Sequence, residues 1–301
     1  MEDTTFARDF IRPYGGGMRS TPYEAAGVRA FLAGLAETDG HRPLSEYKVT
    51  TLGRDKNRAG VWSDDEGICL VAVAARHAGN GHWAIEAALA RRRRTANDEE
   101  AAIEQATGLI STGESYSFWA FRPEQVDAAG RLGYAQVRAV LRMSGPMPIP
   151  SAGSVPGISI GPMAGNDVDA IVGVNNRAFA SHREQGSMTV EGFRSLMTLA
   201  WFDPAGVHVA RSGERVVGFC VTKHEEPAVG EVYLLAVDPD VVGSGIGRAL
   251  AQRGLSRLAD QGAVTAQAWV DAANSPAVGL YQALGLAEDF RNREFVPTGS
   301  S

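Results

Sequence analysis

The feature that most constrains the fold is an apolar run followed by alternate glycines and a helical pattern. Residues 231–237, Glu-Val-Tyr-Leu-Leu-Ala-Val, are mostly apolar and β-prone, which predicts a buried strand. Residues 243–247, Gly-Ser-Gly-Ile-Gly, follow, and apolar residues then recur at helical spacing until Gly262. A helix that begins after such a turn presents unpaired N–H groups and a positive dipole end. The stretch therefore predicts an anion site suited to a pyrophosphate.

The spacing of the glycines narrows the kind of anion site. It is not the dinucleotide fingerprint, because Arg248 stands in place of the last glycine and residues 238–242 separate the strand from the glycines. The chain has no Gly-Lys-Ser/Thr of a nucleotide P-loop. The arrangement resembles the coenzyme A loop of GNAT acetyltransferases, Arg/Gln-x-x-Gly-x-Gly/Ala, with Val242 in the first place and Gly245 and Gly247 in the glycine places. The alternative is a glycine-rich turn that binds no ligand.

Length and composition indicate about two globular domains, since the chain has 301 residues, 44% of them apolar and 21% charged. The net charge is −6, so nucleic acid is not an expected partner. The basic run Arg91–Arg94 is either a solvated charged segment or a phosphate contact.

The cysteines and histidines indicate the cellular compartment and whether a metal is expected. Cys69 and Cys220 lie in apolar runs, which predicts buried strand residues, no disulfide and a cytoplasmic location. The histidines show no metal-ligand spacing with the cysteines, so we expect no metal. We expect no signal peptide, because the N-terminus lacks a basic start and an apolar core. We expect no membrane segment, because no apolar stretch reaches the ~18 residues that a membrane helix needs. The sequence leaves the oligomeric state open, and a monomer is compatible with it.

The predicted elements follow one another in the same order twice, which indicates a tandem duplication. Four prolines and two glycines in residues 144–156 predict a connecting segment. We expect a mixed α/β (α+β) fold with a first domain at 1–145, a linker at 146–156 and a second domain at 157–301, each a mixed central sheet flanked by helices. Expected helices span 22–36, 98–110, 125–132, 167–179, 189–199, 246–261 and 276–284; expected strands span 60–62, 67–75, 82–89, 116–121, 137–143, 207–211, 216–222, 231–237, 266–271 and 290–296.

The first half repeats the layout without the glycines. Residues 95–99, Thr-Ala-Asn-Asp-Glu, fall where the loop would lie. They supply side chains and the negative charges of Asp98 and Glu99 at the place where a pyrophosphate approaches backbone. We therefore expect the first half to lack the anion site.

Acid–base chemistry has two candidate residues near the loop. Glu231 begins the strand and is suited to accept a proton from an attacking amine; alternatively it is a solvated strand-end acid. Tyr281 lies on the last predicted helix and is suited to hydrogen-bond a thiolate; alternatively it is a packed aromatic with a wet tip. Asn274 is a helix cap, with a side chain that also suits contact with a pantetheine arm.

Longer segments resemble the mycothiol synthase family, a group of tandem GNAT enzymes whose C-terminal half acetylates the cysteinyl amine of a glucosamine–inositol precursor with acetyl-CoA. The resemblance covers nearly all of residues 157–286 and, more weakly, 40–143. The segments that carry it are 175–186, 201–206, 217–224, 230–239 and 274–285.

The resemblance assigns roles by position. The family's base and acid fall on Glu231 and Tyr281, and its substrate-binding residues fall on Glu46, Glu184, Lys223 and Trp269, the last replacing a tyrosine. Alternatively, Glu184 and Lys223 form a surface ion pair. The implied acetyl-CoA contacts are Leu235, Ala236, Val237, Val242, Gly243, Ser244, Gly245, Ile246, Gly247, Arg248, Asn274 and Ala277.

Some positions depart from the family pattern. The family loop holds Gln or Arg where this chain has Val242 and a further Arg where it has Ser244, and family members commonly bind acetyl-CoA in both halves. These departures leave three functions open. The first is acetylation of the mycothiol precursor; the second is acetylation of another small-molecule amine, such as an aminoglycoside or a natural-product intermediate; the third is acetyl-CoA binding without turnover.

Overall fold

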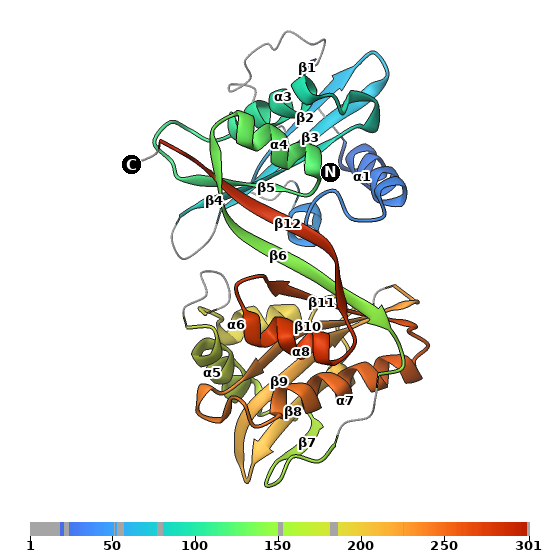
Figure 1. The fold of residues 1–301 in the computed structure, drawn as a ribbon, viewed down its shortest axis with the longest axis vertical. Helices are drawn as coiled ribbons and strands as arrows, with labels where there is room; N and C mark the ends of the chain where they lie inside the picture. Colours follow the sequence, from blue (N-terminus) through green and yellow to red (C-terminus); the bar gives the residue numbers. More distant parts are fainter. Residues whose placement is uncertain are drawn as a thin grey trace. The chain divides into compact units, whose positions relative to one another are not determined.

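The computed structural model of the chain describes residues 19–20, 24–50, 52, 57–76, 81–149, 153–180, 186–224 and 226–299. The chain divides into two compact units, which are considered separately (Figure 1). Unit 1 holds Met1–Ala139 and Asn292–Ser301, and unit 2 holds Val140–Arg291. Each unit is a mixed sheet flanked by helices, which confirms the expected fold class.

Unit 1 contains the strand order β1-β2-β3-β4-β5-β12, in which only β4 and β5 pair in parallel. The segment between the expected strands 67–75 and 82–89 lies mostly outside the described residues. The strands are β1 (Arg19–Ser20), β2 (Asn57–Asp64), β3 (Gly67–Arg76), β4 (Trp83–Leu89), β5 (Tyr116–Ala120) and the end of β12 (Ala287–Pro297); the helices are α1 (Ala25–Asp39), α2 (Glu46–Thr50), the 3₁₀ turn η1 (Arg91–Arg93), α3 (Ala96–Thr107) and α4 (Pro123–Arg131).

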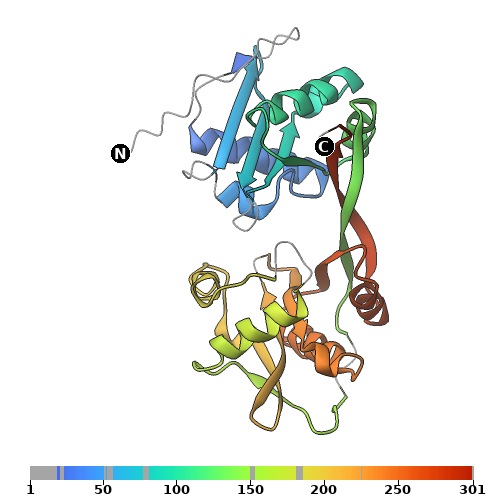
Figure 2. The same cartoon turned by 90° about the vertical axis from the view of Figure 1, so that its left-hand side faces the viewer.

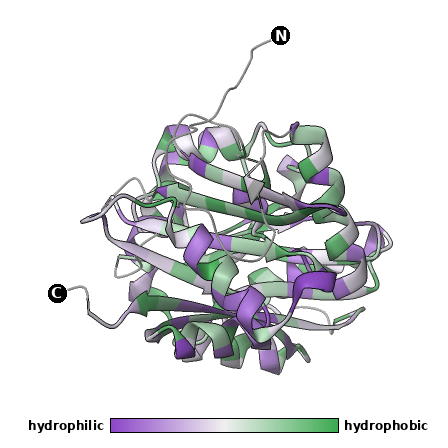
Figure 3. Ribbon diagram, turned by 90° about the horizontal axis from the view of Figure 1, so that it is seen from above, coloured by the Kyte–Doolittle hydropathy of each residue, from purple (hydrophilic) through white to green (hydrophobic). Residues whose placement is uncertain are grey.

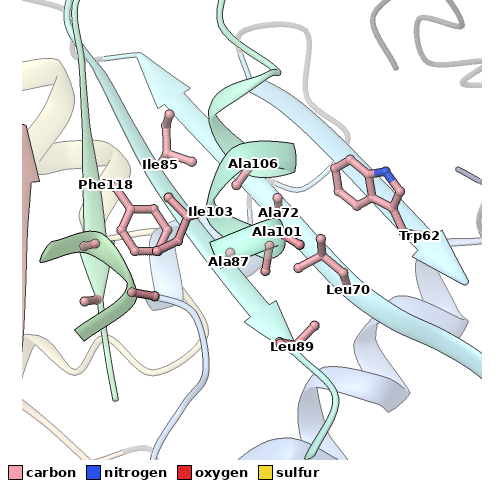
Figure 4. Close-up of a cluster of buried hydrophobic side chains, with 14 of the residues drawn as sticks. Trp62, Leu70, Ala72, Ile85, Ala87, Leu89, Ala101, Ile103, Ala106 and Phe118 are labelled. Atoms are coloured by element: carbon pink, nitrogen blue, oxygen red, sulfur yellow. The ribbon is translucent and has the colours of Figure 1, made fainter. Parts of the chain in front are cut away.

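The core of unit 1 lies between the strands and α3. Leu70 on β3, Ile85 on β4 and Phe118 on β5 belong to one buried cluster with Ile103 and Ala101 of α3 (Figure 4). All five side chains are buried. Burial of an aliphatic or aromatic side chain contributes roughly 1.5–3 kcal/mol, so this layer holds α3 on the sheet.

Unit 2 contains the order β6-β11-β10-β9-β8-β7, in which only β10 and β11 pair in parallel. The strands are β6 (Tyr134–Pro146), β7 (Ser159–Pro162), β8 (Val207–Ser212), β9 (Arg215–Lys223), β10 (Val229–Val237) and β11 (Thr265–Asp271); the helices are α5 (Val168–Ala178), α6 (Val190–Leu196), α7 (Ile246–Asp260) and α8 (Ser275–Ala283), with 3₁₀ turns η2 (Pro204–Gly206) and η3 (Pro239–Val241).

The two faces of the unit 2 sheet carry separate apolar clusters. One cluster joins Val232 and Ala268 of the strands to Leu250 of α7 and to α8. The other joins Val221 and neighbouring strand residues to Phe193 of α6 and to α5. Figure 2 shows α7 and α8 on one side of these strands and α5 on the other. The helices alternate hydrophilic and hydrophobic residues along their length, as amphipathic helices on a sheet do (Figure 3).

The structure differs from the expected boundaries at both ends of the second half. β6 continues through Ser144 to Pro146 and pairs with β11, so the first residues of the proline-rich segment are strand. β12 begins in unit 2, but residues 293–295 pair with β5 of unit 1. Phe295 is buried in the unit 1 core, and the pairing satisfies backbone groups of β5 that a strand edge leaves open.

Candidate active site

β10 parts from its parallel neighbour halfway along its length. It pairs with β9 from Glu231 to Val237, but its registered pairs with β11 end at Val232. The register with β9 shifts between Val232 and Leu234, so a bulge at Tyr233 turns the strand. Beyond Val232, in the described part of the chain, no strand is registered on the β11-facing edge of β10. Backbone groups of residues 235–237 therefore line a gap between the two strands.

The glycine loop beside this gap has the conformation of an anion site. Gly243 and Gly245 have φ of +85° and +86°, which side chains rarely adopt, and no atom lies within 4 Å of an added Cβ at either position. Helix α7 begins at Ile246 with Gly245 as N-cap, without a side-chain cap and without an acid in its first turn. The amino end of α7 is thus left without a capping side chain and without an acidic residue in its first turn, and an anion fits it.

Other loop residues have structural roles. A Cβ on Gly247 would lie 3.1 Å from Leu280 Cδ1 and 3.4 Å from Val237 Cγ2, so α7 packs closely on α8 and β10. The Ser244 hydroxyl donates to the Val241 carbonyl at 2.6 Å. Val242 and Arg248 are exposed at the rim of the loop.

Glu231 lies in a polar row that crosses the sheet. It is half-buried and stands opposite Lys223 on β9 and Gln267 on β11. Gln267 Nε2 donates to the Glu231 carboxylate at 3.4 Å. Directly opposite residues of neighbouring strands share a face, so these side chains lie on the α5–α6 face. That placement puts the candidate base next to the gap between β10 and β11.

Tyr281 lies on the opposite face. It is 5% exposed and belongs to the cluster beneath α7 and α8. Burial raises the pKa of Tyr281 well above its ordinary value, and the Cys220 thiol and the Glu231 carboxylate contribute in the same direction. The phenol is therefore protonated at neutral pH. Within the described residues its hydroxyl makes no hydrogen bond, so it is available to a ligand.

Asn274 caps α8, as its position in the sequence suggested. Its Oδ1 accepts a hydrogen bond from the Ala277 N–H at 3.2 Å, and Asn274 itself is exposed. The cap fixes the start of α8 and hence the position of Tyr281 two turns later.

Lys223 occupies an aromatic environment that the sequence did not reveal. It is 4% exposed, with Nζ 5.0 Å from the Trp201 ring and 5.8 Å from the Tyr233 ring. The two rings lie 4.6 Å apart. Cation–π contacts therefore hold a buried ammonium, which the alternative of a surface ion pair with Glu184 does not describe. The role of Lys223 in substrate binding stays a prediction, and Glu184 lies outside the described residues.

The two other expected substrate residues lie in different units. Trp269 of unit 2 is 38% exposed and stands edge-on to Phe290 at 6.1 Å between ring centroids. Glu46 belongs to unit 1, where Arg42 Nη1 lies 3.5 Å from its carboxylate. All the other described site residues belong to unit 2.

Unit 1 fills the corresponding positions with its own side chains. Its parallel pair β4–β5 is registered only as far as Glu86 and Trp119. Beyond that point, the fully buried Gln125 donates to the Ala87 carbonyl at 2.9 Å and accepts from the Phe121 N–H at 2.8 Å. The side-chain amide thus bridges the two strands where unit 2 has a gap.

The amino end of α3 in unit 1 is closed as well. The Thr95 hydroxyl accepts from the Asp98 N–H, and Asp98 and Glu99 both lie in the first turn. Glu99 is fully buried and pairs with Arg122 at 2.7 Å. The protein's own side chains thus occupy the helix end that α7 leaves open in unit 2.

Other kinds of site are not seen in the described part of the chain. No group of three or more His, Cys, Asp or Glu side chains there is arranged to hold a metal ion. Cys69 and Cys220 are free and buried. None of the described helices is long and apolar enough to cross a membrane.

Comparisons with known proteins place this site in a family. The model of the acetyltransferase (GNAT) family matches residues 176–286, which hold Glu231, the glycine loop and Tyr281. Mycothiol acetyltransferase of Thermomonospora curvata is 34% identical over 270 residues, which cover 86% of this chain and 89% of that protein.

Solved structures support the same fold. A GCN5-related N-acetyltransferase from Sphaerobacter thermophilus matches with a TM-score of 0.75 at 18% identity, covering 94% of this chain and 96% of that one. A tandem GNAT protein from the clavulanic acid biosynthesis pathway matches with a TM-score of 0.64 at 13% identity, covering 92% and 97%. These two structures show a shared fold, whereas the mycothiol acetyltransferase of Thermomonospora curvata is similar in sequence over most of its length. The chain therefore belongs to the mycothiol acetyltransferase family and is an acyltransferase of the GNAT type.

Proposed function

We propose that unit 2 transfers the acetyl group of acetyl-CoA to the cysteinyl amine of a glucosamine–inositol precursor. The observation that carries this proposal is the gap between β10 and β11, which lies beside the uncapped amino end of α7. Glu231 lies on one face of the sheet there and Tyr281 on the other. A proton acceptor and a proton donor thus lie on opposite faces of the sheet, on either side of one extended binding position.

Backbone groups hold the cosubstrate in this proposal. The N–H groups of residues 243–248 bind the pyrophosphate, and residues 235–237 pair with the pantetheine arm along the open edge of β10. Asn274 and Ala277 approach the same arm from the start of α8. Acetyl-CoA supplies the acetyl group as an activated thioester.

Glu231 and Tyr281 handle the protons. Glu231 accepts the proton that the amine loses as its nitrogen bonds to the acetyl carbon, and Tyr281 donates to the sulfur as the carbon–sulfur bond breaks. An α-amino group, with a reference pKa of about 7.7–8.0, loses its proton more easily than a lysine at about 10.4. The negative charge of Glu231 helps to raise the pKa of Tyr281. Protonation of Glu231 removes that contribution, so the phenol becomes a better donor when donation is needed.

The acceptor is held by residues on the Glu231 face. Lys223 supplies a donor beside Glu231, and Trp269 supplies an exposed ring. By position in the family, Glu184 also binds the acceptor. The replacement of tyrosine by Trp269 removes a hydrogen-bond acceptor and leaves only an indole donor. This replacement favours, as a second candidate, an amine on a different polyhydroxylated metabolite.

We also propose that each chain binds one acetyl-CoA. Unit 2 has open glycines and a free helix end, whereas in unit 1 Gln125 bridges the strands and Glu99 occupies the helix end. Titration calorimetry should therefore give one site per chain. Two equivalent sites would contradict the assignment.

The catalytic assignment is tested with purified parent, Glu231→Gln and the control Glu214→Gln, which changes an exposed acid in the β8–β9 turn. Glu231→Gln should lower kcat by about 10²–10⁴-fold with near-normal acetyl-CoA affinity, and the control should match the parent. Turnover of Glu231→Gln at the parent rate would exclude this base. Acetylation of an unrelated aminosugar, with the precursor left untouched, would replace the first acceptor by the second.

A further inference from the structure

The face of the sheet that carries Glu231 continues across β11 and β6 as a row of polar and aromatic side chains. Gln267 stands opposite Ser144, and Trp269 stands opposite Arg142. The side chains of Leu141 and Met143 point to the other face, into the cluster beneath α7 and α8. Arg142, Ser144, Gln267 and Trp269 therefore share the face of the candidate base.

Arg142 and Ser144 fix a carboxylate at the far end of this row. Arg142 Nε and Nη2 donate to the two oxygens of Asp289 at 2.8 and 3.1 Å. The Ser144 hydroxyl donates to Asp289 Oδ2 at 2.8 Å. The Asp289 side chain remains 39% exposed, so the fixed carboxylate is not closed off from solvent. Among the described residues Arg142 Nη1 has no hydrogen-bond partner.

An exposed aromatic ring adjoins this fixed pair. Phe290 lies against Trp269 at 86° to it, and the Arg142 guanidinium lies 5.3 Å from the Phe290 ring. The indole is thereby held in place while 38% of Trp269 stays exposed. A large exposed side chain held by its neighbours contributes contact area at a low entropic cost.

We infer that Trp269, Arg142, Asp289 and Ser144 form a subsite for the hydroxylated rings of the acceptor. Each hydroxyl both donates and accepts hydrogen bonds, and the Asp289–Arg142 pair offers acceptor and donor atoms side by side. The apolar C–H face of a sugar or inositol ring packs on an indole, because both surfaces are poorly hydrated. This inference rests on the proposed function and names which residues hold the part of the acceptor remote from its amine.

The spacing of the strands agrees with such an acceptor. Neighbouring strands lie about 5 Å apart and residues rise about 3.3 Å, so the Cα atoms of Glu231 and Trp269 are separated by roughly 8 Å. Asp289 lies on β12, two strands beyond β11, and its carboxylate is held by Arg142 of the intervening strand β6. An acceptor whose amine lies at Glu231 therefore places its rings on this cluster only when a linker of several bonds joins the amine to the rings.

Two acceptors with the same amine test the subsite. The cysteinyl glucosamine–inositol precursor carries the rings, and cysteine amide lacks them. Asp289→Asn and Trp269→Ala should each raise the KM for the precursor by about 10-fold or more, the worth of one hydrogen bond to a charged group or of one buried aromatic contact. Neither substitution should change kcat/KM for cysteine amide more than about twofold, because this acceptor has no rings to contact the subsite.

A matched control lies on the same strand. Glu288→Gln weakens the exposed Arg291–Glu288 pair and leaves Arg142 and Asp289 intact, so it should match the parent with both acceptors. If Asp289→Asn and Trp269→Ala lower kcat/KM equally for both acceptors, the cluster only supports the sheet and the inference is overturned.

A binding measurement separates this inference from the proposed reaction. Glucosaminyl-inositol without cysteine has no cysteinyl amine to acetylate, and its binding is followed by calorimetry or ligand-observed NMR. Binding to the parent that weakens in Asp289→Asn but not in Glu288→Gln supports the subsite even if the precursor is not turned over. Absence of binding to the parent overturns the subsite even if the precursor is acetylated.

Discussion

The conformation of Gly245 makes a sharp prediction for acetyl-CoA affinity. Its φ is +86°, and no atom lies within 4 Å of an added Cβ, so Gly245→Ala introduces backbone strain without a clash. A side chain in the left-handed region costs about 1–2 kcal/mol. Because nothing packs against the loop at this point, we expect the free loop to relax and to turn its N–H groups away.

Binding must then restore the strained conformation. The cost of about 1–2 kcal/mol corresponds to an acetyl-CoA Kd that rises about 5–30-fold, with a nearly unchanged unfolding temperature. Calorimetry measures the first quantity and thermal denaturation the second. Gly245→Glu should bind still more weakly, since its carboxylate lies where the pyrophosphate docks.

Gly213 provides the matched control for this strain. It lies in the β8–β9 turn with φ +57° and also has no atom within 4 Å of an added Cβ. Gly213→Ala should therefore carry a similar backbone cost without any change in acetyl-CoA affinity. Parent-like binding by Gly245→Ala, or equal weakening by Gly213→Ala, would refute the anion-site reasoning.

Further outcomes follow from individual side chains. Tyr281→Phe should slow the step in which the thiolate leaves, seen as a lower single-turnover rate with unchanged acetyl-CoA affinity; a parent rate would exclude the phenol as donor. Lys223→Ala should raise the KM for the precursor more than it lowers kcat, and the reverse pattern would argue against substrate contact. Arg122→Met should destabilise the fold by about 3–5 kcal/mol in urea denaturation, because Glu99 is left buried without its partner, and Glu99→Leu in the same chain should recover most of the loss. Burial, with Arg253 and Arg257, lowers the pKa of His208 from 6.5 to about 4, so the native state disfavours its protonation. The contribution of neutral His208 to the free energy of unfolding is therefore complete above pH 6.5 and is lost as the pH falls toward 4. Between pH 7 and 4.5 the free energy of unfolding of His208→Asn should fall by about 2–3 kcal/mol less than that of the parent, as urea denaturation measures it.

Local patterns were sufficient wherever neighbouring residues decide the structure. The turn at residues 243–247 followed from its glycines, because only the backbone of glycine adopts these angles freely. The helix expected at 189–199 begins with a residue type that favours caps, and the Thr189 hydroxyl accepts from the Gly192 N–H at the start of α6. The hairpin β8–β9 followed from two alternating runs around a short turn.

Features that depend on distant residues were not predictable from these patterns. The bulge at Tyr233 leaves no signal in a run of apolar residues, because several registers bury the same side chains. The burial of Lys223 was not predictable, since nothing in the sequence shows that Trp201 and Tyr233 lie against its ammonium. The pairing of β12 with β5 joins residues far apart in the chain, and strand propensity does not name a partner.

The sequence by itself determined where the glycine turn before α7 lies and which residues are candidates to move protons, because glycine torsion angles and side-chain acidity are local properties. The tertiary structure decided on which face of the sheet each group lies, that Gln125 closes the equivalent gap in unit 1, and that Arg142 and Asp289 meet near Trp269. These facts depend on strand register and helix packing. Register and packing are settled by the burial of many residues at once, so no short stretch of sequence contains them.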